Sequence, residues 1–345
     1  MSRYALTRRS ITNLQKQKGV ALMLTIFIFA LVSILSVGMY NRQSIFIQTS
    51  GNVLAQTQAY QISLATEVYA RKLLKEDWDA DSENDTKTDD LLWDYMSGSL
   101  TVPIGDAKVQ AQFDDMQGKL NINDIVLVDG QINTVAMGRL ERLIGSLALE
   151  TITVGELIDW IDENQQQPDD MDGAEDGEYL SLDPPYRNAG QVFRHLSELL
   201  LLPTISYQDY DTLKPYVTVL PQGWAKLNIN TASAAVLQSL SSEITAQIAE
   251  ELVTARDDES GEGIWNNIED FKGESLLNGL KLDELTETNL GVRSDFFELR
   301  SKVTLADRKV RLVTVIYRDT EEGAMSVISR DLGQKVPVTK EPADL

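Results

Sequence analysis

The densest group of carboxylates in the chain lies between residues 159 and 178. An apolar run with three acids, LIDWIDEN at residues 157–164, precedes a loop that carries six more acids. Calcium prefers six to eight oxygen ligands, and the side chains and backbone carbonyls of such a loop can supply them. The stretch is therefore a candidate calcium site, and a solvated acidic loop without an ion is the alternative interpretation.

No other group of residues indicates catalysis. The chain has no cysteine, and its single histidine, His195, lies in an amphipathic stretch that we expect to be helical. A nucleophile elbow, a P-loop, a dinucleotide-binding fingerprint and a zinc motif are all absent from the sequence. Paired acids could serve a glycosidase, but nothing in the sequence orients one acid against another. We therefore predict a protein that is not an enzyme.

Charge is distributed unevenly along the chain. There are 53 acidic and 31 basic residues, a formal net charge of −22. Five of the basic residues, and no acidic one, fall within residues 1–19. The remainder is strongly acidic and repels phosphate backbones, so we do not expect a nucleic acid partner. Divalent cations and basic protein surfaces are better matched to it.

An uncharged apolar segment, VALMLTIFIFALVSILSVGMY, occupies residues 20–40. About 20 such residues suffice for a helix to cross a bilayer. The basic flank places the N-terminus in the cytoplasm and the acidic body across the membrane. A secretory signal peptide would have a shorter apolar region with a cleavage site after it. The residues alone also permit an uncleaved signal anchor.

Periodicity predicts one long helix followed by a divided sheet. The helix should continue to about residue 75, because apolar side chains recur every three or four residues. Residues 76–94 are acidic, do not match an EF-hand loop, and are interpreted as a solvated loop. Strand alternation occurs at 100–104 and 109–113 and returns only near 297–305, 310–317 and 324–329. The sequence therefore predicts an insertion between strands of one sheet.

The inserted part contains a short repeat. The sequence LNIN occurs at residues 120–123 and again at 227–230, and amphipathic helical patterns follow each copy. In the second copy, residues 230–233 provide an N-cap context for a helix that should run through Leu240. These halves resemble helix-hairpin-helix or SAM-like modules. Since they are rich in acids, we expect them to be structural or protein-binding rather than DNA-binding.

Five motifs along the chain carry a resemblance to a known family. The junction QKGVAL at residues 17–22 is similar to a prepilin cleavage site. Four further motifs lie along the chain: LIDWIDEN at 157–164, GAEDGEYL at 173–180 followed by PPY at 184–186, KLNINTA at 226–232, and SDFF at 294–297. Together they resemble the type II secretion system protein K family, the GspK minor pseudopilins. The resemblance covers nearly the whole chain, and the combination is far more specific than any single motif.

The resemblance implies a processed N-terminus. The prepilin peptidase would cut after Gly19, and Val20 would become the first, N-methylated residue of the mature chain. Most related pseudopilins have a Glu at the fifth mature position, which neutralises the terminal ammonium of a neighbour in the fibre. Here that position is Leu24, as in protein K. A buried unpaired charge costs several kcal/mol, so Leu24 suits a tip position. Alternatively, Leu24 is one more lipid-facing residue.

The resemblance also implies an α+β pseudopilin fold, with a long N-terminal helix packed on an antiparallel sheet and an inserted all-α domain. The expected boundaries follow in chain order: leader 1–19, transmembrane segment 20–40, first pseudopilin part 41–118, insertion 119–293 with modules 119–222 and 223–293, closing strands 294–333, and a loose tail 334–345.

In this family the insertion binds calcium. The resemblance assigns Ca²⁺ to these oxygen-bearing residues: Asp162, Asn164, Asp170, Glu175 and Asp176. It implies the minor pseudopilins I and J as partners, through them the minor pseudopilin H and the major pseudopilin G, and contact with secreted substrates. The expected location is the bacterial inner membrane, crossed once, with the C-terminal body in the periplasm.

The implied function is to cap the tip of the pseudopilus and to help start its assembly, for export of folded proteins across the outer membrane. A minor pilin of a type IV pilus is one alternative, but it would have a Glu at position 24 and usually a cysteine pair near the C-terminus. A signal-anchored periplasmic enzyme is the other, and it would retain residues 1–19.

Overall fold

The computed structural model describes residues 18–84, 88–89, 99–164, 172–257, 264–282, 285, 289–319 and 322–333. The chain forms two compact units, Met1–Gln58 and Ala59–Leu345. Among the expected segments, the leader up to residue 17 and the tail from residue 334 lie outside the described residues.

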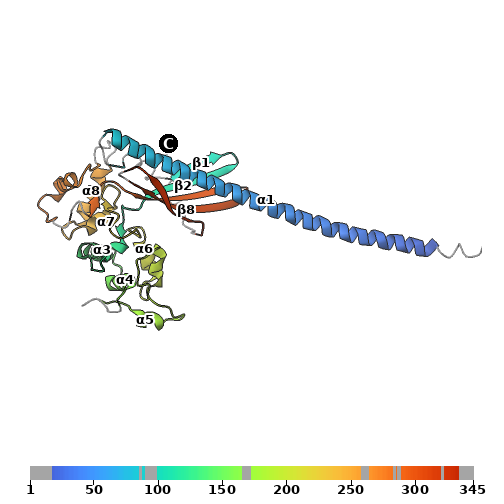
Figure 1. The fold of residues 1–345 in the computed structure, drawn as a ribbon, viewed down its shortest axis with the longest axis horizontal. Coiled ribbons are helices and arrows are strands. Elements are labelled where there is room, and N and C mark those ends of the chain that lie inside the picture. Colours follow the sequence, from blue (N-terminus) through green and yellow to red (C-terminus); the bar gives the residue numbers. More distant parts are fainter. Residues whose placement is uncertain are drawn as a thin grey trace, which may run out of the picture. The chain divides into compact units, whose positions relative to one another are not determined.

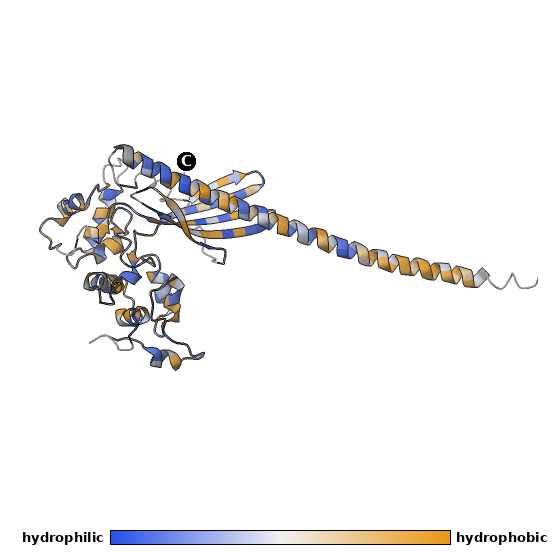
Figure 2. Cartoon of the chain, viewed as in Figure 1, coloured by the Kyte–Doolittle hydropathy of each residue, from blue (hydrophilic) through white to orange (hydrophobic). Residues whose placement is uncertain are grey.

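The first unit contains the N-terminal part of one long helix, α1, which spans Lys18–Asn84. Its large apolar side chains are exposed from Val20 onward, and Figure 2 shows this part of α1 as predominantly hydrophobic. The segment Gly19–Asp81 includes a window that is long and apolar enough to cross a membrane, and none of that window is buried within the protein. This agrees with the anchoring segment expected at residues 20–40.

The second unit contains a five-stranded antiparallel sheet (Figure 1). Its strands, in spatial order, are β1 (Ser99–Ile104), β2 (Ala107–Asp115), β7 (Phe296–Leu305), β8 (Arg308–Arg318) and β9 (Met325–Asp331). Short turns join β1 to β2, β7 to β8 and β8 to β9. Ala306 and Asp307, between β7 and β8, both have positive φ, 45° and 64°, as type I′ hairpins require. The divided sheet predicted from strand alternation is confirmed, because β2 and β7 are adjacent.

The C-terminal part of α1 packs on this sheet. Ala59 belongs to one apolar cluster with Val109 and Val303, and Ala70 and Leu74 belong to another that includes the stacked rings of Phe113 and Phe297. Within the second unit, residues of α1 spaced three or four apart therefore face the sheet, which is the periodicity that predicts the helix.

The interpretation of residues 76–94 as a solvated loop is wrong for its first part, because α1 continues to Asn84. Asp77 is fully buried and pairs with the guanidinium of Arg318 at 2.6 Å, and Asp81 pairs with Arg293 at 3.2 Å. Asp89 pairs with the same Arg318. Arg318 on β8 and Arg293, between β6 and β7, neutralise Asp77 and Asp81, so the helix can continue through an acidic sequence. Residues 85–87 and 90–98 lie outside the described residues.

Between β2 and β7 the chain folds into short helices and two pairs of short strands. The first half contains β3 (Leu120–Asn121), η2 (Ile122–Ile125), α3 (Thr134–Ser146), α4 (Val154–Ile161), α5 (Asp176–Leu180), η3 (Leu196–Leu201), α6 (Tyr207–Leu213) and β4 (Val217–Thr218). The second half contains β5 (Leu227–Asn228), α7 (Ala234–Ser239), α8 (Ala246–Arg256), α9 (Ile268–Lys272), η4 (Ser275–Leu277) and β6 (Leu290–Gly291). Since β3 pairs with β4 and β5 with β6, both in parallel, this part is not purely helical as expected.

The LNIN repeat marks equivalent positions in the two halves. The side chain of Asn123 donates to the carbonyls of Phe193 and Leu220, both at 2.9 Å, and accepts the Phe193 N–H at 2.8 Å. Asn230 makes the same three bonds, to the carbonyls of Trp265 (2.9 Å) and Val292 (3.2 Å) and from the Trp265 N–H (3.0 Å). In each half one buried amide thus joins the start of the module to two later segments.

His195 does not lie within a helix as expected. It is the N-cap of η3, where its ring nitrogen Nδ1 accepts the N–H of Ser197 at 3.1 Å. The amphipathic pattern therefore comes from the helical turn that follows it.

Candidate metal centre

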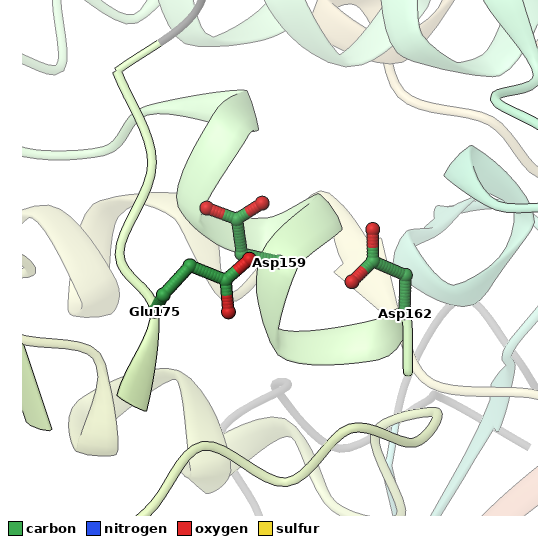
Figure 3. A group of neighbouring side chains, drawn as sticks. All are labelled: Asp159, Asp162 and Glu175. Carbon is green, nitrogen blue, oxygen red and sulfur yellow. The ribbon is translucent and has the colours of Figure 1, made fainter. Parts of the chain in front are cut away.

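Helix α4 and the segment that returns before α5 bring three carboxylates together. Every residue of α4 is buried, so Asp159, in the second half of the helix, is carried into the interior with the apolar residues around it. Asp162 is the C-cap residue of the same helix, and Glu175 is the N-cap residue of α5. Figure 3 shows the three carboxyl groups facing a common space. One ligand oxygen of each lies within 4.8 Å of the other two.

Several buried oxygens of these carboxylates lack the hydrogen-bond partners that buried charges require. Both oxygens of Asp159, Oδ1 of Asp162 and Oε1 of Glu175 are buried, and none has a hydrogen-bond partner among the described residues. The Ala174 amide approaches Asp159 without reaching hydrogen-bond geometry. Burial, and then repulsion from Glu175 and Asp162, raise the pKa of Asp159 to about 7. Burial also raises the pKa of Asp162 and of Glu175. The group is therefore poorly stabilised without a cation.

The segment before α5 packs closely against Asp159 and is held to α4 by hydrogen bonds. A Cβ at Gly173 would lie 1.9 Å from Oδ2 of Asp159, so no larger residue fits there without displacing the carboxylate. The Asn188 amide donates to Oε2 of Glu175 at 3.1 Å and to the Asp159 carbonyl at 3.2 Å, which ties the returning segment to α4. The Glu175 N–H donates to Glu178 at 3.0 Å. Glu175 is thereby held beside α4.

Only some of the five expected calcium ligands lie in this group of carboxylates. Asp162 and Glu175 lie in the group. Asn164 lies beside it, with its amide donating to Oδ2 of Asp162 at 2.7 Å. Asp176 faces elsewhere, because its carboxylate pairs with Arg187 at 2.9 Å and accepts the Asn188 N–H at 3.2 Å. Asp170 lies outside the described residues.

Asp159 was not among the expected ligands. The signal that could have found it is its spacing, because residues three apart on a helix share a face, and Asp159 and Asp162 are three apart. The second signal is that Asp159 lies within the run LIDWI at residues 157–161, whose other members are apolar, since such a residue is buried with its neighbours.

The donor set fits a hard cation. Carboxylate oxygens without nitrogen or sulfur ligands suit Ca²⁺, which takes further oxygens from carbonyls, amides and water. The residues of the group that would hold Ca²⁺ are Asp159, Asp162 and Glu175, with Asn164 close enough to contribute.

The expected processing positions lie at the start of α1. Gly19, Val20 and Leu24 are all helical, and Leu24 is 59% exposed. Their roles in cleavage, methylation and placement in the fibre stay predictions.

Comparison with known proteins decides the family. Two family models described as type II secretion system protein K match residues 118–222 and 227–293. A protein K of Pseudomonas aeruginosa is 33% identical over 324 residues, which cover 92% of this chain and 93% of that relative. The chain belongs to the type II secretion system protein K family. It is thus a minor pseudopilin, a structural component of that secretion system.

Further relatives agree with this assignment. A protein K of Klebsiella pneumoniae is 30% identical over 277 residues, which cover 76% of this chain and 81% of the relative. Among solved structures, a chain of the GspK–GspI–GspJ complex from enterotoxigenic Escherichia coli matches with a TM-score of 0.67 and 23% identity, over 81% of this chain and 97% of the other. That likeness shows a shared fold.

Proposed function

We propose that this protein K occupies the tip of the pseudopilus, where it caps the fibre and helps to start its assembly. The observation that carries the proposal is the insertion between β2 and β7, which makes the protein much bulkier than its sheet and helix alone. Such a body would obstruct a further pseudopilin above it. Leu24 supports the same position, because it offers no carboxylate to the terminal ammonium of another pseudopilin.

We propose the minor pseudopilins I and J as direct partners, and through them the minor pseudopilin H and the major pseudopilin G. The solved structure that shares this fold is a complex of proteins named GspK, GspI and GspJ, which supports the choice. We further propose that the prepilin peptidase cuts after Gly19 and that Val20 is methylated. The mature chain would then lie in the inner membrane with its body in the periplasm, within reach of secreted substrates.

We propose that Asp159, Asp162 and Glu175 hold a structural Ca²⁺, with Asn164 as a further ligand. The buried oxygens without hydrogen-bond partners support this role. The cation would neutralise the crowded carboxylates and fix the segment before α5 against α4. Asp170 and Asp176 are additional candidates, although Asp176 would first have to leave Arg187.

The tip position can be tested by counting copies of this protein per fibre. The chain can be rejoined across the insertion, because the ends of its flanking strands adjoin, with the Met116 N–H donating to the Phe296 carbonyl at 3.0 Å. Sheared pseudopili of different lengths should each carry one intact copy, at one end, by gold labelling. Fibres made with the chain lacking residues 117–294 should carry several. A copy number of the intact protein that grows with fibre length would contradict the tip position.

A further inference from the structure

Helix α1 covers one face of the five-stranded sheet, and basic side chains gather on the opposite face. Val109, Val303 and Val310 pack with Ala59 of α1 in one apolar cluster. Since successive side chains of a strand point to opposite faces, the residues next to these valines face away from α1. The four cations among them form what we call the basic patch: Lys108 on β2, Lys302 on β7, and Lys309 and Arg311 on β8.

The strand register arranges the basic patch in two rows. In one row Lys108 and Lys309 lie on either side of Thr304. In the next row Lys302 is paired directly with Arg311. Neighbouring strands are about 4.8 Å apart and alternate residues of a strand about 6.7 Å, so the four Cα atoms lie within roughly 12 Å of one another. The pair of Lys302 and Arg311 is like-charged, which is destabilising without a neutralising partner.

The chain provides no counter-charge to the basic patch. Within the part of the chain that the structure describes, none of the four basic side chains forms a hydrogen bond or an ion pair. Nε of Arg311 is buried without a hydrogen-bond partner, whereas Lys108 and Lys309 are exposed. Cations elsewhere, such as Arg187, do pair with carboxylates.

The acids at the opposite end of this face are engaged by other cations. Asp114 and Glu298 both pair with Arg300, and Lys119 lies close enough to interact with both electrostatically. These two acids therefore have two counter-charges of their own. Insertion residues such as Tyr207 line a cavity together with them, so this end of the face is partly covered.

Three further acids lie near the basic patch. Asp106 and Asp307 are exposed residues of the turns beside it, and Asp331 on β9 lies opposite Val313. Among the described residues, none of these carboxylates pairs with a cation of the patch. The four patch cations, with Arg308 next to them, outnumber the three acids, so the local charge remains positive.

We propose that the basic patch binds an extended, acid-rich segment of a partner protein. Acids two residues apart in such a segment are separated by about 6.7 Å, which matches the spacing of Lys309 and Arg311 along β8. Gln110 and Thr304 lie beside the cations in the same rows, and their side chains can hydrogen-bond to the backbone of the segment. The two rows contain no large apolar side chain that could enter a lipid layer, so they suit a peptide better than a membrane. This inference does not depend on the tip position or on calcium.

The test measures binding of a fluorescein-labelled octaglutamate peptide to the full-length chain in an uncharged detergent, by fluorescence anisotropy. A salt concentration of about 0.1 M is suitable, because charges then act over about 10 Å and the distant acids of the chain are screened. Lys108→Gln/Lys302→Gln/Lys309→Gln should bind the peptide at least about tenfold more weakly, equivalent to about 1.4 kcal/mol. An octaglutamine peptide should not bind the unaltered chain.

Matched variants separate the basic patch from general charge and from misfolding. Lys214→Gln/Lys226→Gln/Lys281→Gln removes the same charge from the insertion and should bind the peptide as the unaltered chain does. Thermal unfolding shows whether each variant is folded. Lys108→Gln/Lys309→Gln alters only exposed residues, so it tests the patch if the triple variant fails to fold.

Four results would overturn the proposal. The first is that octaglutamate does not bind the unaltered chain, and the second is that the patch variant keeps the binding. The third is that the insertion variant loses as much binding as the patch variant, because the effect would then be one of general charge. The fourth is that phosphatidylglycerol vesicles, but not the peptide, bind through the same lysines, which would make a membrane surface the occupant.

Discussion

Replacing Asp159 with asparagine should have opposite effects on stability with and without calcium. In the presence of Ca²⁺ the variant lacks a charged ligand and should be less stable than the unaltered chain. In the presence of a chelator it should be as stable or more stable, because one of three crowded carboxylates has been removed. The crossing of the two effects distinguishes a cation site from an ordinary buried acid.

The magnitude follows from the environment of Asp159. Burial and its acidic neighbours raise the pKa of this carboxyl from 3.8 to about 7. A tenfold change in an equilibrium corresponds to about 1.4 kcal/mol, so keeping Asp159 ionised without a cation costs up to roughly 4 kcal/mol. Calcium at 100 times its dissociation constant would stabilise the folded chain by about 2.7 kcal/mol, or roughly 5–10 °C in melting temperature.

Thermal unfolding of the full chain in detergent at pH 8, with excess Ca²⁺ or with EGTA, provides the assay. Asp211→Asn is the matched control, because it removes one exposed carboxylate from the same half of the insertion. The control should respond to calcium as the unaltered chain does. If EGTA leaves the melting temperature of the unaltered chain unchanged, a stabilising calcium site is refuted. If Asp159→Asn is equally destabilising with calcium and with EGTA, the argument from repulsion is refuted.

Three further predictions concern buried polar groups. Burial, opposed by Arg318, raises the pKa of Asp89 to about 7. The folded chain therefore holds this proton more tightly than the unfolded chain, and stability should fall as pH rises from about 4 to about 7. Asp89→Asn should flatten that slope in urea denaturation. Arg330→Gln should lower the free energy of unfolding by about 2 kcal/mol at neutral pH, because it leaves the buried Glu67 carboxylate without its main partner. The loss should not be larger, because the Arg330 side chain is partly exposed to water. Asn123→Ala and Asn230→Ala should each lower the free energy of unfolding by about 3 kcal/mol, because each leaves one buried N–H and two buried carbonyls without a hydrogen bond. If the two losses, measured by urea denaturation, differ by more than about 2 kcal/mol, the two asparagines are not equivalent.

Much of the fold could be predicted from local pattern. The alternation of apolar residues around Val109 and again around Val303 was sufficient to predict one sheet with an insertion, because both strands bury the same face. The end of α1 could not be predicted in this way. Its acidic sequence is helical because Arg318, some 240 residues later, neutralises Asp77, and such a contact has no local signal.

The site could be predicted only in part. The density of acids indicated a cation site in this stretch, and the resemblance to the protein K family assigned Asp162 and Glu175 to it. The path of the chain past Gly173 and the hydrogen bonds from Asn188 decide which carboxylates face one another. The number of acids in the sequence gives no information on either. Asp159 was recoverable from helical spacing, whereas the pairing of Asp176 with Arg187 was not.

The placement of this chain as an assembling pseudopilin is tested most directly by its intact mass after extraction from membranes of a host that has a prepilin peptidase. The account predicts a chain that starts at Val20 and carries one added methyl group. A chain that retains residues 1–19 would contradict it, because an unprocessed pseudopilin would stay an ordinary membrane-anchored protein and could not enter the fibre.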